Sequence, residues 1–390
     1  MEDFEYRLPT RFVFGRGAEA KVGEAAVACG ASRALVVFGG GSVVRSGLLA
    51  RVVESLEAAG VPFAELGGVK PNPLSDLVYR GIDLVRAEGV DLVLALGGGS
   101  VIDTAKAIAA GACYEGDFWD FYGGDLEPER ALPVGVVLTI AASGSEASPD
   151  SVITQSETML KRETSSPALL PAFSILDPEL TCTLPAYQTA CGITDMYSHV
   201  LERYFTRSGD VGVTDRMIEG LMLAILDEAP TVMADPEDYG ARANLMWAAT
   251  MAHCDIAGVG RKQDWASHDI EYALSSRYGV AHGAGLAVVM LAVERFYLDC
   301  ATERLARLAR HVWGVELEDD RRAAEAGIEA QESFFASIGM PTRLPQIGAK
   351  AEDIPSLAKE TCWAGGRTGT VGGFRPLDES DVARVLELAL

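Results

Sequence analysis

The hydrophobic pattern of this chain changes halfway along its length, and that change restricts the fold more than any other feature. In the first half, short apolar runs rich in Val, Ile and Leu alternate with amphipathic stretches of helical period. The apolar runs are Ala34–Phe38, Asp91–Leu96, Gly135–Thr139 and Phe173–Leu176, and helical patterns include Val44–Ala59 and Ser75–Glu88. Strand, helix and strand at this spacing predict right-handed βαβ units and therefore a parallel sheet.

The second half shows helical periodicity and turn residues, but no convincing series of strands, from about Ala186 to the end. We therefore predict two domains. Residues 1–184 form a Rossmann-like α/β domain with a parallel sheet, and residues 185–390 form an all-α domain. The segment Arg11–Gly15 reads as one additional strand whose partner the sequence does not identify.

The charge balance limits the partners that the chain can have. Its 390 residues include 33 Lys and Arg against 56 Asp and Glu, a formal net charge of −23. A field of this sign repels phosphate backbones and anionic membrane surfaces, so we expect neither nucleic acid nor a membrane as a partner. The acidic N-terminus and seven scattered cysteines without metal-type spacing favour a cytoplasmic location.

Two glycine-rich loops predict a nucleotide site. Gly39–Ser42 follows the first apolar run, and Gly97–Ser100 follows Asp91–Leu96. Glycines let the backbone approach a ligand closely, and the free N–H groups at a helix start favour a phosphate. Neither loop has the G-x-G-x-x-G spacing, because Val44 and Ile102 stand where the third glycine belongs. Either loop alone is equally compatible with a tight turn, but two at successive strand ends favour ligand binding.

Side chains beside these loops refine the prediction. Ser100 followed by Asp103 is a capping-box pattern that marks a helix start. The loop Phe38–Ser42 contains no acidic residue to bind a ribose hydroxyl, and Arg45 lies just beyond it, which favours NADP(H) over NAD(H). The alternative for Arg45 is an ordinary solvated surface arginine.

A second group of residues indicates a metal site. Asp195 and His199 are four residues apart in a helical segment, so they share one helix face. His268 and His282 would be about 21 Å apart on a continuous helix, but Tyr278–Val280 contains a glycine that can break it. One carboxylate and three imidazoles suit a divalent ion such as zinc or iron. The alternative is a capping or ion-paired Asp195 with histidines of purely structural role.

Several motifs in order resemble the iron-containing (group III) alcohol dehydrogenases, and most closely their butanol dehydrogenase branch, which includes NADPH-dependent aldehyde reductases. The matching segments are Gly97–Ala107, Leu138–Glu146, Gly192–His199 and Gly279–Gly285, and the similarity runs from end to end. The resemblance implies a dehydroquinate synthase-like fold, with dimerisation through the N-terminal strand supplying the partner of Arg11–Gly15.

The same resemblance implies the site residues. Asp195, His199, His268 and His282 are expected to hold one catalytic Fe²⁺ or Zn²⁺ ion. The residues expected to contact the cofactor are Gly39, Gly40, Ser42, Arg45, Asn72, Gly98, Gly99, Ser100, Asp103, Thr139, Ser143, Val152 and Lys161.

One departure from the family affects the expected chemistry. Many relatives carry a histidine four residues after the third metal ligand, beside the nicotinamide, where this chain has Tyr272. Proton-relay roles of that histidine therefore cannot be transferred. Trp265 and Tyr272 are expected to line the substrate pocket, and we favour Tyr272 as an apolar wall over a proton donor.

These expectations combine into one function, with alternatives. The chain is predicted to be a metal-dependent alcohol dehydrogenase or aldehyde reductase that transfers hydride between NADP(H), or alternatively NAD(H), and a small alcohol or aldehyde such as butanol or butanal. It is expected to be a homodimer. Glycerol dehydrogenase and maleylacetate reductase chemistries, a metal-dependent hydrolase and a non-catalytic nucleotide-binding subunit are the competing interpretations.

Overall fold

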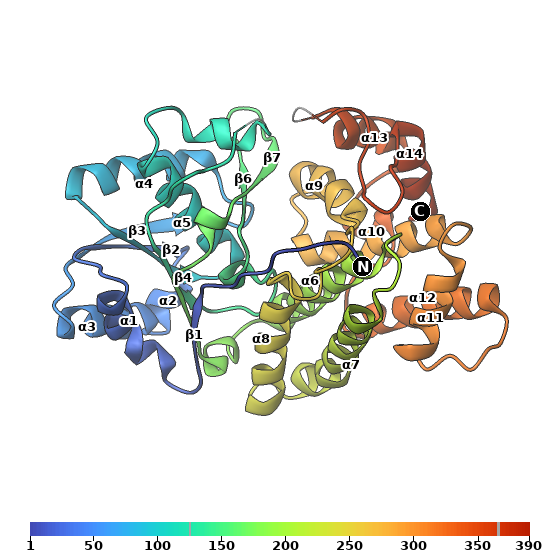
Figure 1. The fold of residues 1–390 in the computed structure, drawn as a ribbon, viewed down its shortest axis with the longest axis horizontal. Helices are drawn as coiled ribbons and strands as arrows, with labels where there is room; N and C mark the ends of the chain where they lie inside the picture. Colours follow the sequence, from blue (N-terminus) through green and yellow to red (C-terminus); the bar gives the residue numbers. More distant parts are fainter. Residues whose placement is uncertain (125, 365–366) are drawn as a thin grey trace. The chain divides into compact units, whose positions relative to one another are not determined.

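The computed structural model describes residues 1–124, 126–364 and 367–390. The chain divides into two compact units, Arg7–Thr183 and Leu184–Leu390, and the second includes Met1–Tyr6 (Figure 1). The first six residues belong to the helical unit because they hydrogen-bond to it: the Glu2 amide donates to the carbonyl of Gly260 at 2.8 Å. The predicted combination of an α/β domain with a parallel sheet and a helical domain is confirmed.

The unit Arg7–Thr183 is built on a six-stranded parallel sheet in the order β1-β8-β5-β4-β2-β3. The strands are β1 (Arg11–Phe14), β2 (Ala34–Gly39), β3 (Phe63–Val69), β4 (Leu92–Gly97), β5 (Val134–Leu138) and β8 (Phe173–Leu176). All four apolar runs in the sequence are strands. The sequence did not indicate β3, because this edge strand contains Glu65 and two glycines and is only partly buried.

The strand β1 has its partner within the same chain. It pairs in parallel with β8, with Arg11 opposite Phe173 and Phe14 opposite Leu176. A second subunit is therefore not needed to supply the partner of this strand, contrary to the expectation from the sequence. The N-terminal strand extends the sheet of its own domain, at the edge opposite β3.

Helices cover both faces of the sheet in this unit (Figure 1). They are η1 (Ala18–Lys21), α1 (Val22–Ala28), α2 (Ser42–Arg45), α3 (Leu48–Ala58), α4 (Ser75–Glu88), α5 (Gly99–Ala112), η2 (Phe118–Tyr122), η3 (Ser145–Ala147), η4 (Pro167–Leu169) and η5 (Pro178–Thr181). The predicted helix Val44–Ala59 is interrupted, because Gly47 adopts a left-handed φ of 74° between α2 and α3. A hairpin, β6 (Asp150–Thr154) and β7 (Lys161–Ser165), was not expected.

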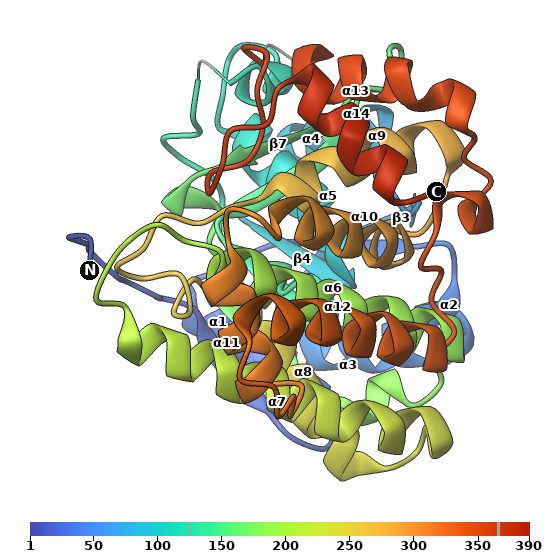
Figure 2. The same cartoon turned by 90° about the vertical axis from the view of Figure 1, so that its right-hand side faces the viewer.

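The second unit consists of helices around two central ones (Figure 2). They are α6 (Ala186–Tyr204), α7 (Gly212–Ala234), α8 (Tyr239–His253), α9 (Ala266–Tyr278), α10 (His282–Tyr297), α11 (Thr302–His311), α12 (Asp320–Ser337), η6 (Leu344–Ile347), η7 (Ala351–Asp353), α13 (Ile354–Trp363) and α14 (Glu379–Leu388). Burial extends all round α6 and α10, which makes them the core. In the described part of the chain, no helix combines the length and apolar character needed to cross a bilayer.

Candidate nucleotide and metal sites

The two glycine-rich loops follow the carboxyl ends of neighbouring strands, β2 and β4. Phe38 pairs with Leu96 and Gly97 pairs with Leu138, so the carboxyl ends of β2, β4 and β5 are level. The amide of Thr139 then donates to the carbonyl of Gly97 at 3.1 Å. Open parallel sheets bind their ligands beside the carboxyl ends of their strands.

Glycine is required where β4 turns into α5. A Cβ atom at Gly98 would lie 2.1 Å from Cγ2 of Ile140, and one at Gly99 would lie 2.5 Å from Oγ of Ser143. The loop after β5 therefore packs directly on the start of α5. This helix has Gly98 as its N-cap and no side-chain cap, so the amides of its first turn suit a phosphate.

The capping box predicted at Ser100 is not formed. Ser100 lies inside α5, and the carboxylate of Asp103 instead accepts hydrogen bonds from Oγ of Ser145 at 2.7 Å and from the amide of Val152 at 3.2 Å. Burial raises the pKa of Asp103 to about 6. The capping pattern failed because tertiary partners outcompeted the local one.

Sequence reasoning missed Lys106, which holds the segment between these two contacts. Its ammonium group is fully buried and donates to the carbonyls of Ser145, Ser148 and Asp150, each at 2.8 Å. Burial lowers the pKa of Lys106, and Asp103 opposes that shift. The only sequence indication is a lysine on a helix of small apolar residues, where a solvated charge is out of place.

The other residues predicted to bind the cofactor lie in the same unit. Arg45 is exposed on α2, and its Nη1 would be 3.3 Å from a Cβ atom at Gly41. Asn72 adopts a left-handed φ of 52° between two prolines, and the amide of Thr154 donates to the carbonyl of the second, Pro73, at 2.8 Å. Lys161 pairs with Thr154 across the β6–β7 hairpin.

The helical unit brings the predicted metal ligands together from three helices. Asp195 and His199 are on α6, His268 is on α9 and His282 is the first residue of α10. Gly279, with a φ of 64°, ends α9 and allows the chain to reverse, as the sequence predicted. Nε2 of His268 and Nε2 of His282 lie 4.0 and 3.8 Å from Oδ1 of Asp195.

Three of the four residues form a compact donor set. One ligand atom each from Asp195, His268 and His282 lies within 4.8 Å of the others. His199 lies beside this set: its ring centroid is 4.5 Å from that of His268, and its Nδ1 is 2.9 Å from the carbonyl of Asp195. The helix start of α10 can approach because of Gly283, where a Cβ atom would lie 2.1 Å from the carbonyl oxygen of Cys191 on α6.

The protonation states of these groups suit a cation. Burial acts to raise the pKa of Asp195, but the charge and hydrogen bond of His199, followed by the charge of His282, outweigh it and hold this pKa well below its usual value. Burial, aided by the two neighbouring imidazoles, lowers the pKa of His268 well below its usual value, so its ring is neutral. An ionised carboxylate and a neutral imidazole are the forms that bind metals.

Two donor atoms of this set are otherwise unsatisfied. Within the described residues, Oδ1 of Asp195 and Nε2 of His268 are buried and make no hydrogen bond of good geometry, although Nδ1 of His199 lies 3.3 Å from this Oδ1. Buried polar atoms are rarely left in this state. A divalent cation bound by these residues would satisfy both, so the donor set fits a metal ion.

Two glutamates that sequence reasoning missed contact the far side of the imidazoles. Nδ1 of His268 donates to Glu202, whose other oxygen accepts from the amide of Ser267 at 2.6 Å. Nδ1 of His282 donates to Glu271. Burial raises the pKa of Glu202 to about 7. Carboxylates in this position orient metal-binding histidines. The sequence did not indicate them, because Glu202 and Glu271 follow His199 and His268 by three residues, a spacing that is common on any helix.

Aromatic side chains surround the cluster. His253 packs on His199 with ring centroids 4.2 Å apart, and Nη2 of Arg203 is 3.2 Å from its Nδ1. Trp265, which has a left-handed φ of 99°, lies 5.3 Å from the ring of His268. The ring of Tyr272 is stacked 6.0 Å from that of His282. Both predicted pocket residues therefore lie beside the donor set.

Comparison with known proteins gives consistent matches along the whole chain. The profile of the iron-containing alcohol dehydrogenases matches residues 9–178, and the profile of the C-terminal region of the Fe-containing alcohol dehydrogenase family matches residues 189–390. A probable NADH-dependent butanol dehydrogenase of Bacillus subtilis is 40% identical over 100% of both chains. The NADPH-dependent aldehyde reductase YqhD of Escherichia coli is 38% identical over 92% of this chain and 93% of its own. The solved structure of a Thermotoga maritima NADH-dependent butanol dehydrogenase superposes with a TM-score of 0.97 at 39% identity, covering 100% of this chain and 99% of that one.

Proposed function

The chain belongs to the iron-containing alcohol dehydrogenase family, and from this premise we propose that it transfers hydride between NADP(H) and a small primary alcohol or aldehyde, such as butanol or butanal. It is a nicotinamide-dependent, metal-dependent alcohol dehydrogenase or aldehyde reductase by family. The observation that carries the proposal is the donor set of Asp195, His268 and His282, with ligand atoms within 4.8 Å and two of them buried without hydrogen bonds.

We assign four residues to one divalent metal: Asp195, His199, His268 and His282. A metal bound there supplies Lewis-acid stabilisation of the negative charge that develops on the substrate oxygen. The protein contributes an ionised Asp195 and a neutral His268, and it turns the Nε2 atoms of His268 and His282 toward Asp195 by binding Nδ1 of each ring. The donor set suits both Fe²⁺ and Zn²⁺, which metal analysis of the purified protein will distinguish.

The metal assignment is tested by His268→Ala and His282→Ala. Each variant should lose bound metal and nearly all turnover, yet still bind NADPH, because the glycine-rich loops belong to the other unit. Metal content, measured by atomic emission, and NADPH affinity, measured by fluorescence, report the two sites separately. Unchanged metal content and activity in either variant would remove that histidine from the ligand set.

We place the pyrophosphate of the cofactor at Gly98, Gly99 and Ser100 on the uncapped start of α5, and the adenosine phosphate at Gly39, Gly40 and Ser42 with Arg45. Asn72, Asp103, Thr139, Ser143, Val152 and Lys161 complete the proposed cofactor site. Arg45 follows a loop that contains no acidic residue, and this combination favours NADP(H). The names of the butanol dehydrogenase relatives favour NAD(H), whereas that of the aldehyde reductase favours NADP(H).

Substituting Gly39→Asp tests this preference. A Cβ atom at position 39 would lie 3.5 Å from the carbonyl oxygen of Val69, an ordinary contact, so an aspartate fits without disturbing β2. The new carboxylate would repel a 2′-phosphate and bind a ribose hydroxyl. We expect kcat/KM with NADPH to fall relative to NADH. A wild-type preference for NADH, or an unchanged ratio in the variant, would refute the assignment of the phosphate site.

The substrate pocket is assigned to Trp265 and Tyr272, whose rings lie beside His268 and His282. A panel of straight-chain aldehydes, glyceraldehyde and maleylacetate, each assayed with both cofactors, separates the proposed activity from the glycerol dehydrogenase and maleylacetate reductase alternatives. We also propose a homodimer, which light scattering of the purified protein tests.

A further inference from the structure

In each of the three imidazoles of the proposed metal site, Nδ1 has a hydrogen-bond partner, but the rings differ in how tightly the surrounding atoms confine them. His199 uses the carbonyl of Asp195 on its own helix, at 2.9 Å. His268 uses Glu202, which is itself held by the amide of Ser267. These two rings are also enclosed by packing, with side chains 5% and 7% exposed.

His282 is held differently. It is the first residue of α10, directly after the reversal at Gly279, and its side chain is 26% exposed. Fewer neighbouring atoms confine this ring, so the partner of its Nδ1 has more influence on its orientation. That partner is Glu271 on α9.

Glu271 is fully buried, which is unusual for a carboxylate. Burying it is unfavourable unless a hydrogen-bonded or charged partner compensates for the lost hydration. Because the Nδ1–H of His282 donates to Glu271, Nε2 of that ring is left as the acceptor that can face Asp195, 3.8 Å away.

The space for Glu271 is provided by Gly285, one turn into α10 from His282. A Cβ atom at Gly285 would lie 2.7 Å from Oε1 and 2.8 Å from Cγ of Glu271, closer than such atoms approach. Glycine in a helix interior is less favourable than alanine, so its presence here is explained by this contact. The two positions therefore act as a matched pair.

We propose that Glu271 is a positioning residue for the metal site, fixing the tautomer and orientation of His282, and that Gly285 is the residue that makes room for it. This inference rests on the proposed metal-binding function and deepens it. Loss of a carboxylate in this position typically weakens metal affinity 10–100-fold, the change expected for Glu271→Ala. Glu271→Gln keeps an oxygen that accepts from Nδ1, so its affinity should fall less.

The variant Gly285→Ala separates positioning from folding. The added methyl group would lie 2.7 Å from Oε1, 2.8 Å from Cγ and 3.2 Å from Cδ of Glu271, all of them side-chain atoms, so we expect the Glu271 side chain rather than the backbone of the helix to shift and to lose its place beside His282. We expect a lower metal affinity without a lower melting temperature of the metal-free protein. Adding Gly285→Ala to Glu271→Ala should cause little further loss, because the group that the methyl displaces is already gone.

The experiment uses the full chain, stripped of metal with a chelator and titrated with Co²⁺ by visible absorption and with Zn²⁺ by competition. The matched control is Glu294→Gln, an equally buried glutamate of α10 that accepts from Gln331 and contacts no assigned ligand. Its Co²⁺ affinity should equal that of the wild type. If the wild-type chain binds neither ion, the proposed function itself fails.

If the wild type binds Co²⁺ and Glu271→Ala binds it within twofold as tightly, the positioning role is refuted. Additive losses in the double variant would refute the pairing of Glu271 with Gly285. A 10–100-fold loss in Glu271→Ala, a smaller one in Glu271→Gln and non-additive losses in the double variant support the proposal.

Discussion

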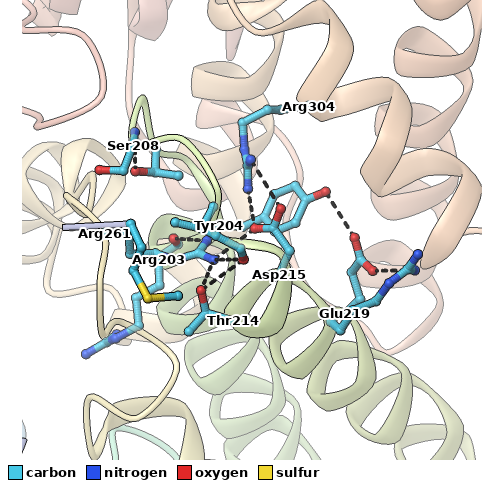
Figure 3. A network of polar contacts seen from close by, with 12 residues as sticks. Arg203, Tyr204, Ser208, Thr214, Asp215, Glu219, Arg261 and Arg304 are labelled. Carbon is cyan, nitrogen blue, oxygen red and sulfur yellow. Dashed lines mark hydrogen bonds and ion pairs between the residues drawn. The ribbon is translucent and has the colours of Figure 1, made fainter.

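Replacing Asp215 by Asn should destabilise the helical unit, because Asp215 accepts hydrogen bonds from two arginines in a buried network (Figure 3). Its Oδ1 accepts from Nη2 of Arg261 at 2.9 Å and from Nη2 of Arg304 at 2.8 Å. The side chain of Arg261 is fully buried and also donates to the carbonyls of Arg203 and Val211. The network therefore ties the segment before α9 to the end of α6 and the start of α7.

The magnitude follows from this geometry. Removing one partner of a buried ion pair costs about 3–5 kcal/mol, because the remaining charge is left buried without compensation. Arg304 is 20% exposed and regains water in the variant, so we expect a loss near the lower limit, about 3 kcal/mol. For a unit of about 200 residues, that corresponds to a melting temperature lower by roughly 6–12 °C.

The pH dependence has a definite sign. Burial acts to raise the pKa of Asp215, but Arg304 and Arg261 hold it below its usual value. A carboxyl group with a lowered folded-state pKa contributes stability above its unfolded pKa of about 3.9, and this contribution is lost as the pH falls through the folded value. The stability difference between wild type and Asp215→Asn should therefore be constant from about pH 5 to 8 and shrink below about pH 4.

The assay is unfolding by heat and by urea, followed by circular dichroism at several pH values. Asp299→Asn is the matched control, since Asp299 pairs with Arg321 while its own side chain is 90% exposed. An exposed pair contributes about 0–1 kcal/mol. Equal losses in the two variants, or a difference in Asp215→Asn that persists undiminished at pH 3, would refute the reasoning.

Three further predictions concern the two sites. Tyr272→Phe should keep kcat within about tenfold, since loss of a true general acid costs roughly 10²–10⁴, and a larger fall with metal and NADPH binding intact would make the phenol catalytic. Gly283→Ala should lower both metal affinity and thermal stability, by about 1–3 kcal/mol, because its methyl group would meet the backbone of Cys191; unchanged Co²⁺ titration and melting curves would contradict this. Lys106→Met should destabilise the α/β unit by about 3 kcal/mol and weaken NADPH binding by releasing the segment between Ser143 and Val152, whereas intact cofactor affinity would limit Lys106 to a folding role.

Local sequence patterns were sufficient to predict the fully buried strands, one amphipathic helix and one helix break. The four apolar runs are strands because both faces of a parallel sheet are covered, which requires continuous hydrophobic residues. The helix α4 has the predicted bounds Ser75–Glu88. The break between α9 and α10 could be placed at Gly279, because a left-handed φ strongly favours glycine.

Tertiary structure decided the features that depend on residues far apart in sequence. The pairing of β1 with β8 joins segments about 160 residues apart, which no local period encodes. Asp103 was available for a local cap but bonds instead to Ser145 and Val152, because burial makes those contacts stronger.

The proposed metal site shows the same division. The residues Asp195 and His199 could be grouped from the sequence, since helix geometry places positions four apart on one face. The partners Glu202 and Glu271 could not, because a glutamate three residues after a histidine is common on solvated helices. Only the packing of α6, α9 and α10 buries these carboxylates against Nδ1 of His268 and His282, and burial converts an ordinary surface residue into one that orients a ligand.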